Sequence, residues 1–235
     1  MDKKVVITGA SKGIGKALAI RFALEGYYVA VCSRDENNLK ALADEIKSMG
    51  TRYPLFYSVC NVRKREDITA FYDKVKKEFG AIDILVNNAG IFLPGQIMNE
   101  EGGVFEEVMS VNVASAYHFT RLFAKGMMER KSGHIFNMCS VASIKAYPNG
   151  GSYCISKFAL LGMTKVLREE MKEHNIKVTA VLPGATYTDS WSGTGLPEER
   201  FIPAEDIANT IFQISKLSPR TNVEEILLRP QLGDI

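Results

Sequence analysis

The chain is 235 residues long, 46% hydrophobic and 24% charged, with a formal net charge of +2. This length is sufficient for one large α/β domain with a substantial core, and the balanced charge argues against nucleic-acid or membrane-surface partners. No apolar run reaches membrane-spanning length, and the start, MDKKVVITGA, does not resemble a secretion signal. We therefore expect a cytoplasmic protein.

Short apolar runs alternate with helical patterns along the chain. Strands are predicted at Val5–Thr8, Tyr28–Cys32, Leu55–Cys60, Ile84–Asn87, His134–Cys139, Val178–Leu182 and Glu225–Arg229. Helices are predicted at Ile14–Glu25, along stripes from Leu39 to Met49 and Ile68 to Phe79, from about Val104 to Arg130, around Tyr153, and with Pro203 in a first turn. The alternation predicts one Rossmann-type α/β domain over residues 1–235, a doubly wound parallel sheet of about seven strands with helices on both faces.

The first predicted turn, TGASKGIG, places Gly9, Gly13 and Gly15 between a strand and a helix. Glycines at such a turn let the backbone approach a pyrophosphate held at the helix N-terminus. An ordinary tight turn can have a similar sequence, and the glycine spacing departs from the general G-x-G-x-x-G pattern. The position directly after the first strand nevertheless favours a nucleotide-binding loop.

The second predicted strand ends in Cys32-Ser33-Arg34. Sites specific for NAD place an acid near this point for the ribose 2′-hydroxyl, whereas an arginine suits a 2′-phosphate. Arg34 and Lys12, in the glycine loop, therefore favour NADPH over the alternative of two ordinary surface bases. Asp35 leaves the choice open, because it follows Arg34 directly.

The segment from Ser140 to Lys157 carries the candidate chemistry. Tyr153 and Lys157 are four residues apart and would share one face of a helix, while Ser140 would lie at the carboxyl end of a strand, where open α/β sheets bind ligands. A tyrosine can give a proton to a carbonyl oxygen that has received hydride, a nearby lysine cation favours the tyrosinate, and a serine can hydrogen-bond the oxygen. The pair alone is a weak signal, because Tyr72 and Lys76 repeat it in a helix where we expect a surface pair.

Further motifs make the chain resemble the short-chain dehydrogenase/reductase family, including small bacterial sepiapterin reductase-like and 3-oxoacyl-acyl-carrier-protein reductase-like members. TGASKGIG is similar to the family's TGxxxGxG loop, Asn87-Asn88-Ala89-Gly90 to its NNAG motif, and Pro183-Gly184 to its PG motif. The matches to the family's catalytic tetrad are Asn112, Ser140, Tyr153 and Lys157. The order and spacing of these motifs cover essentially the whole chain.

The resemblance also implies roles for individual residues. Lys157 would bond the nicotinamide ribose, Asn112 would kink its helix and hold a water for proton relay, and Thr188 would meet the nicotinamide carboxamide. Asn61 is a departure from the family's usual aspartate, and its amide oxygen is still expected to reach adenine. The residues expected to bind NADPH are Gly9, Ser11, Lys12, Gly13, Ile14, Gly15, Ser33, Arg34, Asn61, Val62, Asn88, Ala89, Gly90, Tyr153, Lys157, Pro183, Gly184, Thr186 and Thr188.

Substrate specificity is expected from segments beyond the strand ends, at Ile91–Gln96, Ala142–Tyr147 and Ala185–Ile202, the last as a short lid. Phe92, Tyr147 and Trp191 would line an apolar pocket or, equally, belong to the core or a subunit contact.

No metal is expected, because the cysteines and histidines lack ligand spacing. We expect buried reduced thiols at Cys32, Cys60, Cys139 and Cys154, and structural or exposed histidines at His118, His134 and His174.

These observations predict an NADPH-dependent oxidoreductase that reduces a ketone or aldehyde, with a 3-oxoacyl thioester or a sepiapterin-like or diketone substrate. An alcohol dehydrogenase working in the oxidising direction would use the same four residues. A non-catalytic sensor of NADP(H) is a third reading, although it would not need all four. The resemblance implies a homo-tetramer or homo-dimer, formed through the helices that carry Asn112 and Tyr153.

Overall fold

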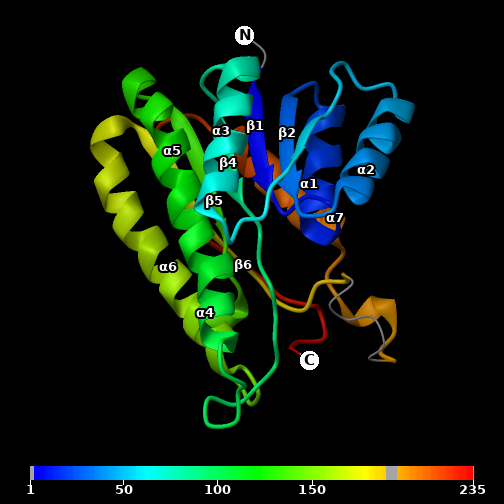
Figure 1. Cartoon of the computed structure of the whole chain (residues 1–235), viewed down its shortest axis with the longest axis vertical. Helices are drawn as coiled ribbons and strands as arrows, with labels where there is room; N and C mark the ends of the chain where they lie inside the picture. Colours follow the sequence, from blue (N-terminus) through cyan, green and yellow to red (C-terminus); the bar gives the residue numbers. More distant parts are fainter. Residues whose placement is uncertain (1–2, 189–194, 235) are drawn as a thin grey trace.

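The computed structural model describes residues 3–188 and 195–234 (Figure 1). Its strands form one sheet in the order β3-β2-β1-β4-β5-β6-β7, and every neighbouring pair is parallel. The predicted doubly wound fold is therefore confirmed. The strands are β1 (Lys4–Thr8), β2 (Tyr28–Ser33), β3 (Phe56–Val59), β4 (Ile84–Asn87), β5 (Gly133–Met138), β6 (Ile176–Pro183) and β7 (Glu225–Leu228).

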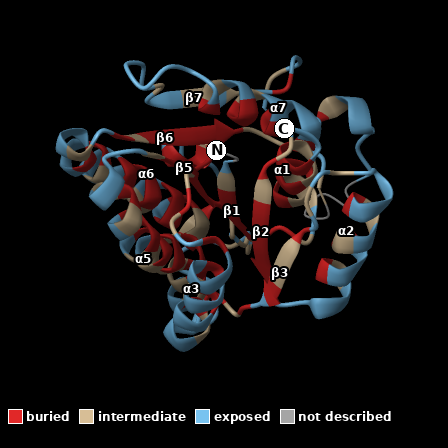
Figure 2. Cartoon of the chain, turned by 90° about the horizontal axis from the view of Figure 1, so that it is seen from above, coloured by how far each residue is buried: buried red, intermediate tan, exposed pale blue. Residues whose placement is uncertain are grey.

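Helices cover both faces of this sheet, because parallel neighbours need crossover connections. They are α1 (Gly13–Leu24), α2 (Glu36–Ser48), α3 (Arg65–Phe79), α4 (Val104–Met109), α5 (Ser115–Arg130), α6 (Gly151–Met171) and α7 (Ala204–Ser215). One core joins the sheet to α1, α2 and α7, and a second joins it to α3 and α5. Figure 2 shows the central strands buried between these layers, whose outer surfaces are exposed, while the outermost strands β3 and β7 are only partly buried.

The strand residues alternate between the two cores. Val5 and Ile7 of β1 face the α1 side, whereas Val6 faces the α3 side, as the two-residue period of a strand requires. Phe22 on α1 and Phe71 on α3 are fully buried, one in each core. Burial of such a side chain contributes roughly 1.5–3 kcal/mol, so both layers are held firmly against the sheet.

Two local features differ from the sequence-based expectation. Pro203 is the N-cap of α7 and not part of its first turn; its ψ of 137° is extended, and the helix begins at Ala204. Lys76 is exposed as expected, but Tyr72 is half-buried. The Tyr72 ring packs edge-on against Phe123, with centroids 5.0 Å apart, and the Lys76 ammonium lies 5.7 Å from the centre of the Tyr72 ring.

The long helical region predicted from Val104 to Arg130 is present but contains a change of helix type. A π-helical turn, Ser110–Ala114, joins α4 to α5 and includes Asn112. None of the helices in the described ranges combines the length and hydropathy needed to cross a membrane.

Candidate active site

A pocket of about 370 Å³ opens at the carboxyl ends of the central strands. The strand order reverses between β1 and β4, which is where open α/β sheets bind their ligands. Several predicted site residues line this pocket: Ile14, Asn88, Gly90, Ser140, Tyr153, Lys157, Pro183, Gly184, Thr186 and Thr188. Segments far apart in the sequence thus bring three of the four predicted catalytic residues and part of the predicted cofactor residues to one cavity.

The glycine loop between β1 and α1 has the close backbone approaches that its sequence suggests. Gly9 and Gly13 have φ values of 66° and 52°, a region that favours glycine. A Cβ on Gly9 would lie 2.8 Å from Ala89 Cα, and one on Gly15 would lie 2.5 Å from Asn88 Nδ2. Side chains at these positions would displace the loop, so the glycines keep open the approach to the N-terminus of α1.

Asn88 ties this loop to the end of β4. Its Nδ2 donates to the carbonyl oxygens of Thr8 and Gly9 at 2.9 and 3.0 Å. The Thr8 hydroxyl accepts from the backbone N–H groups of Asn88 and Ala89. The predicted cofactor residues on both sides of the switch point therefore form one hydrogen-bonded unit, and Thr8 is a member that the sequence did not single out.

The end of β2 explains why an acid follows Arg34. The carboxylate of Asp35 accepts from the backbone N–H of Asn38 at 3.0 Å and from Asn38 Nδ2 at 2.7 Å, and so caps α2. Arg34 itself is exposed. The Ser33 hydroxyl donates to Ser11 Oγ at 3.0 Å, which joins the end of β2 to the glycine loop.

At the end of β3, Asn61 uses its side chain locally. Its Oδ1 accepts from the backbone N–H of Arg63 at 3.1 Å, and its own N–H donates to Asp67 at 2.9 Å. An amide oxygen has two lone pairs, so one remains for an adenine contact. Asn61 and the buried Val62 lie outside the lining of the main pocket.

Different contacts surround the three catalytic candidates that line the pocket. Lys157 is buried, and its Nζ donates to the Met138 carbonyl at 2.8 Å and lies 5.7 Å from the centre of the Tyr153 ring. The Ser140 hydroxyl accepts from the N–H of Ala142 at 3.1 Å and donates to the Pro183 carbonyl over 3.4 Å. These contacts fix a cation, a phenol and a hydroxyl around one space.

Asn112 lies behind the pocket, in the π-helical turn. Its Oδ1 accepts from Ile91 N at 2.8 Å, and its Nδ2 donates to Ile91 O at 3.0 Å and Ser156 Oγ at 2.9 Å. The Ser156 hydroxyl in turn donates to the Tyr153 carbonyl at 2.7 Å. π-Helical turns occur often at functional sites, and this one connects the loop after β4 to the turn that carries Tyr153.

Aromatic rings form one wall of the pocket. Phe92 meets Tyr153 edge-on with centroids 4.9 Å apart, and Tyr147 also lines the cavity. Burial raises the pKa of the Tyr147 phenol well above its usual value, with Tyr153 a secondary cause, so Tyr147 is a neutral hydrogen-bonding group. The predicted third ring, Trp191, lies outside the described residues.

Two charged residues that the sequence did not single out line the pocket, although Lys145 falls in the predicted substrate segment Ala142–Tyr147. The two are Lys145 and Asp234, and Lys145 Nζ lies 3.9 Å from the Asp234 carboxylate. Arg229 also pairs with Asp234. No motif marks Asp234, because only the path of the chain after β7 brings it to the carboxyl end of β5.

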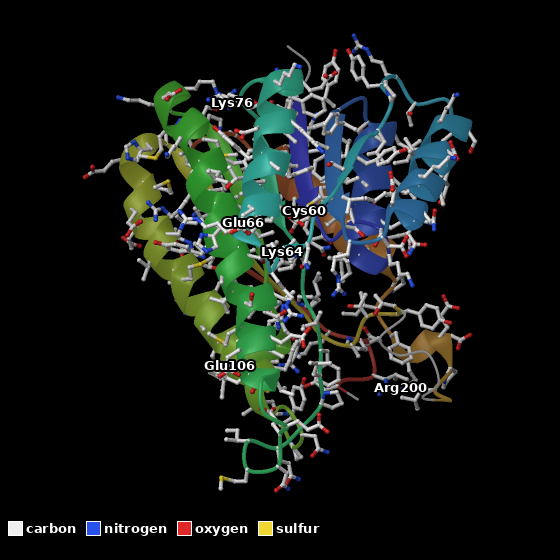
Figure 3. All side chains as sticks on the ribbon, in the orientation of Figure 1. Cys60, Lys64, Glu66, Lys76, Glu106 and Arg200 are labelled. Atoms are coloured by element: carbon white, nitrogen blue, oxygen red, sulfur yellow. The ribbon has the colours of Figure 1, made fainter. Side chains whose placement is uncertain are left out.

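The four cysteines have structural surroundings. Cys32, Cys60, Cys139 and Cys154 are free and buried, as predicted; Figure 3 shows Cys60 inside the molecule. Burial raises the pKa of Cys139 to about 11, so this pocket-lining thiol is unreactive at neutral pH. Among the described residues, no group of three or more histidine, cysteine or acidic side chains is placed to hold a metal ion.

Comparison with known proteins identifies relatives over almost the whole chain. The family model described as short chain dehydrogenase matches residues 3–198. Sepiapterin reductase from Chlorobaculum tepidum is 34% identical, covering 100% of this chain and 99% of that protein. The 3-oxoacyl-[acyl-carrier-protein] reductase FabG from Staphylococcus epidermidis is 31% identical, with 90% of each chain covered. An alcohol dehydrogenase from the archaeon Thermococcus sibiricus, solved with 5-hydroxy-NADP, superposes with a TM-score of 0.91 at 28% identity and covers 100% of this chain and 99% of that one.

Proposed function

The chain belongs to the short-chain dehydrogenase family, and we propose that it is an NADPH-dependent reductase of a ketone or aldehyde. The observation that carries the proposal is the convergence of Ser140, Tyr153 and Lys157 on one pocket beside the glycine loop. The archaeal relative, solved with 5-hydroxy-NADP, supports the choice of cofactor class.

The loop geometry fits a dinucleotide. The glycines leave room for a pyrophosphate at the start of α1, whose first turn contains no acidic residue to repel an anion. Arg34 and Lys12 would meet the 2′-phosphate, and the cap made by Asp35 removes the acid that would otherwise favour NAD. NADPH, when bound, supplies the hydride. Thr186 and Thr188 would hold its nicotinamide end against the pocket.

The proton chemistry belongs to this chain. Ser140 would hydrogen-bond the substrate carbonyl oxygen, and the Tyr153 hydroxyl would donate a proton to that oxygen as it becomes an alkoxide. Lys157 stabilises the phenolate left behind, because its cation is buried beside the ring. Asn112, through Ser156, would hold the turn that carries Tyr153 and connect Lys157 to a relay of water.

The relatives support two classes of substrate, a 3-oxoacyl thioester and a sepiapterin-like or diketone compound. The lining of Phe92 and Tyr147 suits either class, since both present apolar surface next to the carbonyl. The pair of Lys145 and Asp234 adds charge to a pocket wall that is otherwise largely apolar. The segment from Ala185 to Ile202, of which residues 189–194 lie outside the described ranges, is proposed as a lid over the substrate.

We further propose a cytoplasmic homo-oligomer, a tetramer or a dimer, assembled through α5 and α6. These helices expose large apolar side chains, of which Tyr117, Phe158 and Val166 are between 46% and 60% exposed. Apolar surface on adjacent helices is typical of subunit contacts. Light scattering of the purified protein at several concentrations tests this assembly.

The experiment that tests the function follows NADPH consumption with a 3-oxoacyl thioester, a vicinal diketone, a pteridine side-chain ketone and simple aldehydes. Turnover that disappears in Tyr153→Phe would support the reductase and select the substrate class. Tight NADPH binding with no turnover would favour the sensor instead. Faster conversion of the corresponding alcohols with NADP⁺ at neutral pH would favour the oxidising direction.

A further inference from the structure

Helix α6 carries Tyr153 and Lys157 but lacks a cap of its own. Its N-cap residue is Gly150, which has no side chain to accept a hydrogen bond, and its first turn contains no acidic residue. The backbone N–H groups of a first turn need partners from elsewhere. Tyr153 is the third residue of this helix, so whatever completes the first turn also holds the phenol.

Glu100 supplies the missing cap from 52 residues away. One carboxylate oxygen accepts from the backbone N–H of Ser152 at 2.7 Å, and the other accepts from the Ser152 hydroxyl. A negative charge at a helix N-terminus is further stabilised by the helix dipole. In Figure 1 the loop before α4 lies at the same end of the molecule as the start of α6.

The approach of Glu100 depends on glycines in both segments. A Cβ on Gly151 would collide with the Glu100 carboxylate and lie 2.7 Å from the Gly95 carbonyl, and one on Gly95 would lie 2.7 Å from Glu100 Cγ. Gly95 also donates its N–H to the Asn149 carbonyl at 3.0 Å. The Glu100 carboxylate therefore fills the space beside these glycines. Its close approach explains why a glycine, Gly151, stands two residues before Tyr153.

The same contact fixes the loop that forms a pocket wall. Asn112 holds this loop at Ile91, and Glu100 holds it at its other end. Phe92, between the two anchors, meets the edge of Tyr153. Loss of the Glu100 contact would release the loop and the first turn of α6 together, and both contribute to where the substrate lies relative to the phenol.

We propose that Glu100 is a positioning residue for the reduction, acting through the first turn of α6 and the 91–100 loop. This inference rests on the proposed function, since it assigns Tyr153 as the proton donor. Small displacements of a reacting group reduce rates steeply, by on the order of 100-fold for 1 Å. Glu100→Ala should accordingly lower kcat by ~10- to 100-fold, while the dissociation constant for NADPH stays within about twofold.

The control for general destabilisation is Asp83→Ala. The Asp83 carboxylate also accepts a hydrogen bond from the backbone of a distant segment, the N–H of Lys4 at 2.8 Å. This contact lies where the strands begin, at the end opposite the pocket. Its variant should lose thermal stability and keep kcat. Equal reductions of kcat in both variants, measured well below their melting temperatures, would overturn the proposal, as would a Glu100→Ala variant with the kcat of the unmodified protein.

A second pair of variants keeps the test valid if Glu100→Ala does not fold. Glu100→Gln retains an acceptor for the Ser152 N–H and should lose less kcat than Glu100→Ala, whereas Ser152→Ala removes only the hydroxyl contact. The two changes combined should reduce kcat by less than the product of the single effects, because both act on one contact. Strictly multiplicative effects would contradict the proposal.

Hydrogen exchange separates this inference from the proposed function, because it needs no substrate. Glu100→Ala should speed amide exchange at residues 152–154 at least about tenfold and Glu100→Gln by less, and neither should change exchange in α2. Unchanged exchange in the first turn of α6 would overturn the positioning role even in an active enzyme. Faster exchange in a protein without carbonyl reduction would uphold the cap and contradict only the proposed reaction.

Discussion

The two sides of the parallel sheet on which its strands begin and end, called here the amino-terminal and carboxyl-terminal edges, use their polar groups differently. At the amino-terminal edge, Asp83 accepts from Lys4 N, the Lys4 ammonium donates to the Phe79 carbonyl, and Arg130 donates to the Ile82 carbonyl. At the carboxyl-terminal edge, glycines and the ends of strands surround an open pocket. These three contacts at the amino-terminal edge are made within the fold, whereas the carboxyl-terminal edge leaves groups available to a ligand.

This contrast has a consequence for function. The guanidinium of Arg130 donates to the Ile82 carbonyl and lies 3.9 Å from the Asp83 carboxylate, so this cation is used within the fold. Changes at the amino-terminal edge should therefore alter stability without altering turnover. Changes at the carboxyl-terminal edge should do the opposite.

The largest effect should come from Tyr153→Phe. General acid catalysis contributes ~10²- to 10⁴-fold, so we expect kcat to fall by about 1,000-fold while NADPH binding, measured by fluorescence titration, is retained. Tyr72→Phe is the matched control, because Tyr72 has the same spacing to a lysine but packs on Phe123. Equal activity of the two variants would contradict the assignment of Tyr153.

The next largest effect should come from Gly15→Ala. The new Cβ would lie 2.5 Å from Asn88 Nδ2, and relief of such an overlap costs ~1–3 kcal/mol. NADPH affinity should fall by roughly 10- to 100-fold, as seen by calorimetry. Gly102→Ala, where a Cβ meets nothing within 4 Å, should bind NADPH normally; a similar loss there would contradict the role of the loop.

Arg34→Ala should change cofactor preference more than activity. Loss of a charge-assisted hydrogen bond to a 2′-phosphate costs ~1.5–3 kcal/mol when the contact is well formed, and we expect about tenfold at this exposed position. The Michaelis constant for NADPH should rise while that for NADH changes little. Arg63→Ala, whose guanidinium pairs with Glu107 instead, is the control, and equal weakening of both cofactors would refute the reading of Arg34.

The sequence predicted the residues that line the carboxyl-terminal edge better than the residues that hold them in place. The loop from Gly9 to Gly15 is marked by its place between a strand and a helix, and Ser140, Tyr153 and Lys157 are marked by their spacing together with the resemblance to the family. Glu100 and Asp234 were missed, because their roles depend on segments that meet only in three dimensions. No pattern in the sequence locates such a contact.

Some of the missed features left a local signal. Asp35, three residues before Asn38 and directly before a helical stripe, has the pattern of an N-cap. An acid that caps a helix does not indicate a site for the ribose 2′-hydroxyl of NAD, so this interpretation would have favoured NADPH more clearly. The half-burial of Tyr72 was harder to foresee, because α5 supplies its partner Phe123. The π-helical turn at Asn112 has no recognised sequence signature and was expected only as a kink implied by the family.

At the other edge, Asp83→Ala should reduce the free energy of unfolding by about 1 kcal/mol, the net value of a typical hydrogen bond. The kinetic constants should stay within about twofold, since the pocket lies at the far ends of the strands. Urea unfolding and steady-state kinetics on the same preparation measure both quantities. A drop in kcat larger than the drop in the folded fraction would show that the two edges are coupled.

The smallest effect concerns His134, on the second residue of β5. Its Nε2 lies 2.8 Å from Thr179 Oγ1, whose hydroxyl donates to the Val223 carbonyl at 2.7 Å. Thr179 must then accept from His134, so the proton is on Nε2 and Nδ1 is bare. Nδ1 is buried without a hydrogen-bond partner among the described residues, and burial, followed by Lys177 and Lys3, holds the pKa of His134 well below 6.5.

Because the folded-state pKa of His134 is depressed, the unfolded chain binds the additional proton as the pH falls below 6.5. The stability associated with the neutral ring is therefore complete above this pH and is lost below it, by roughly 0.8 kcal/mol at pH 6. Urea unfolding between pH 7.5 and 5.5 measures the slope, and His134→Gln should reduce it. If the pH dependence of the free energy of unfolding is unchanged in that variant, groups other than His134 cause the loss of stability at acid pH.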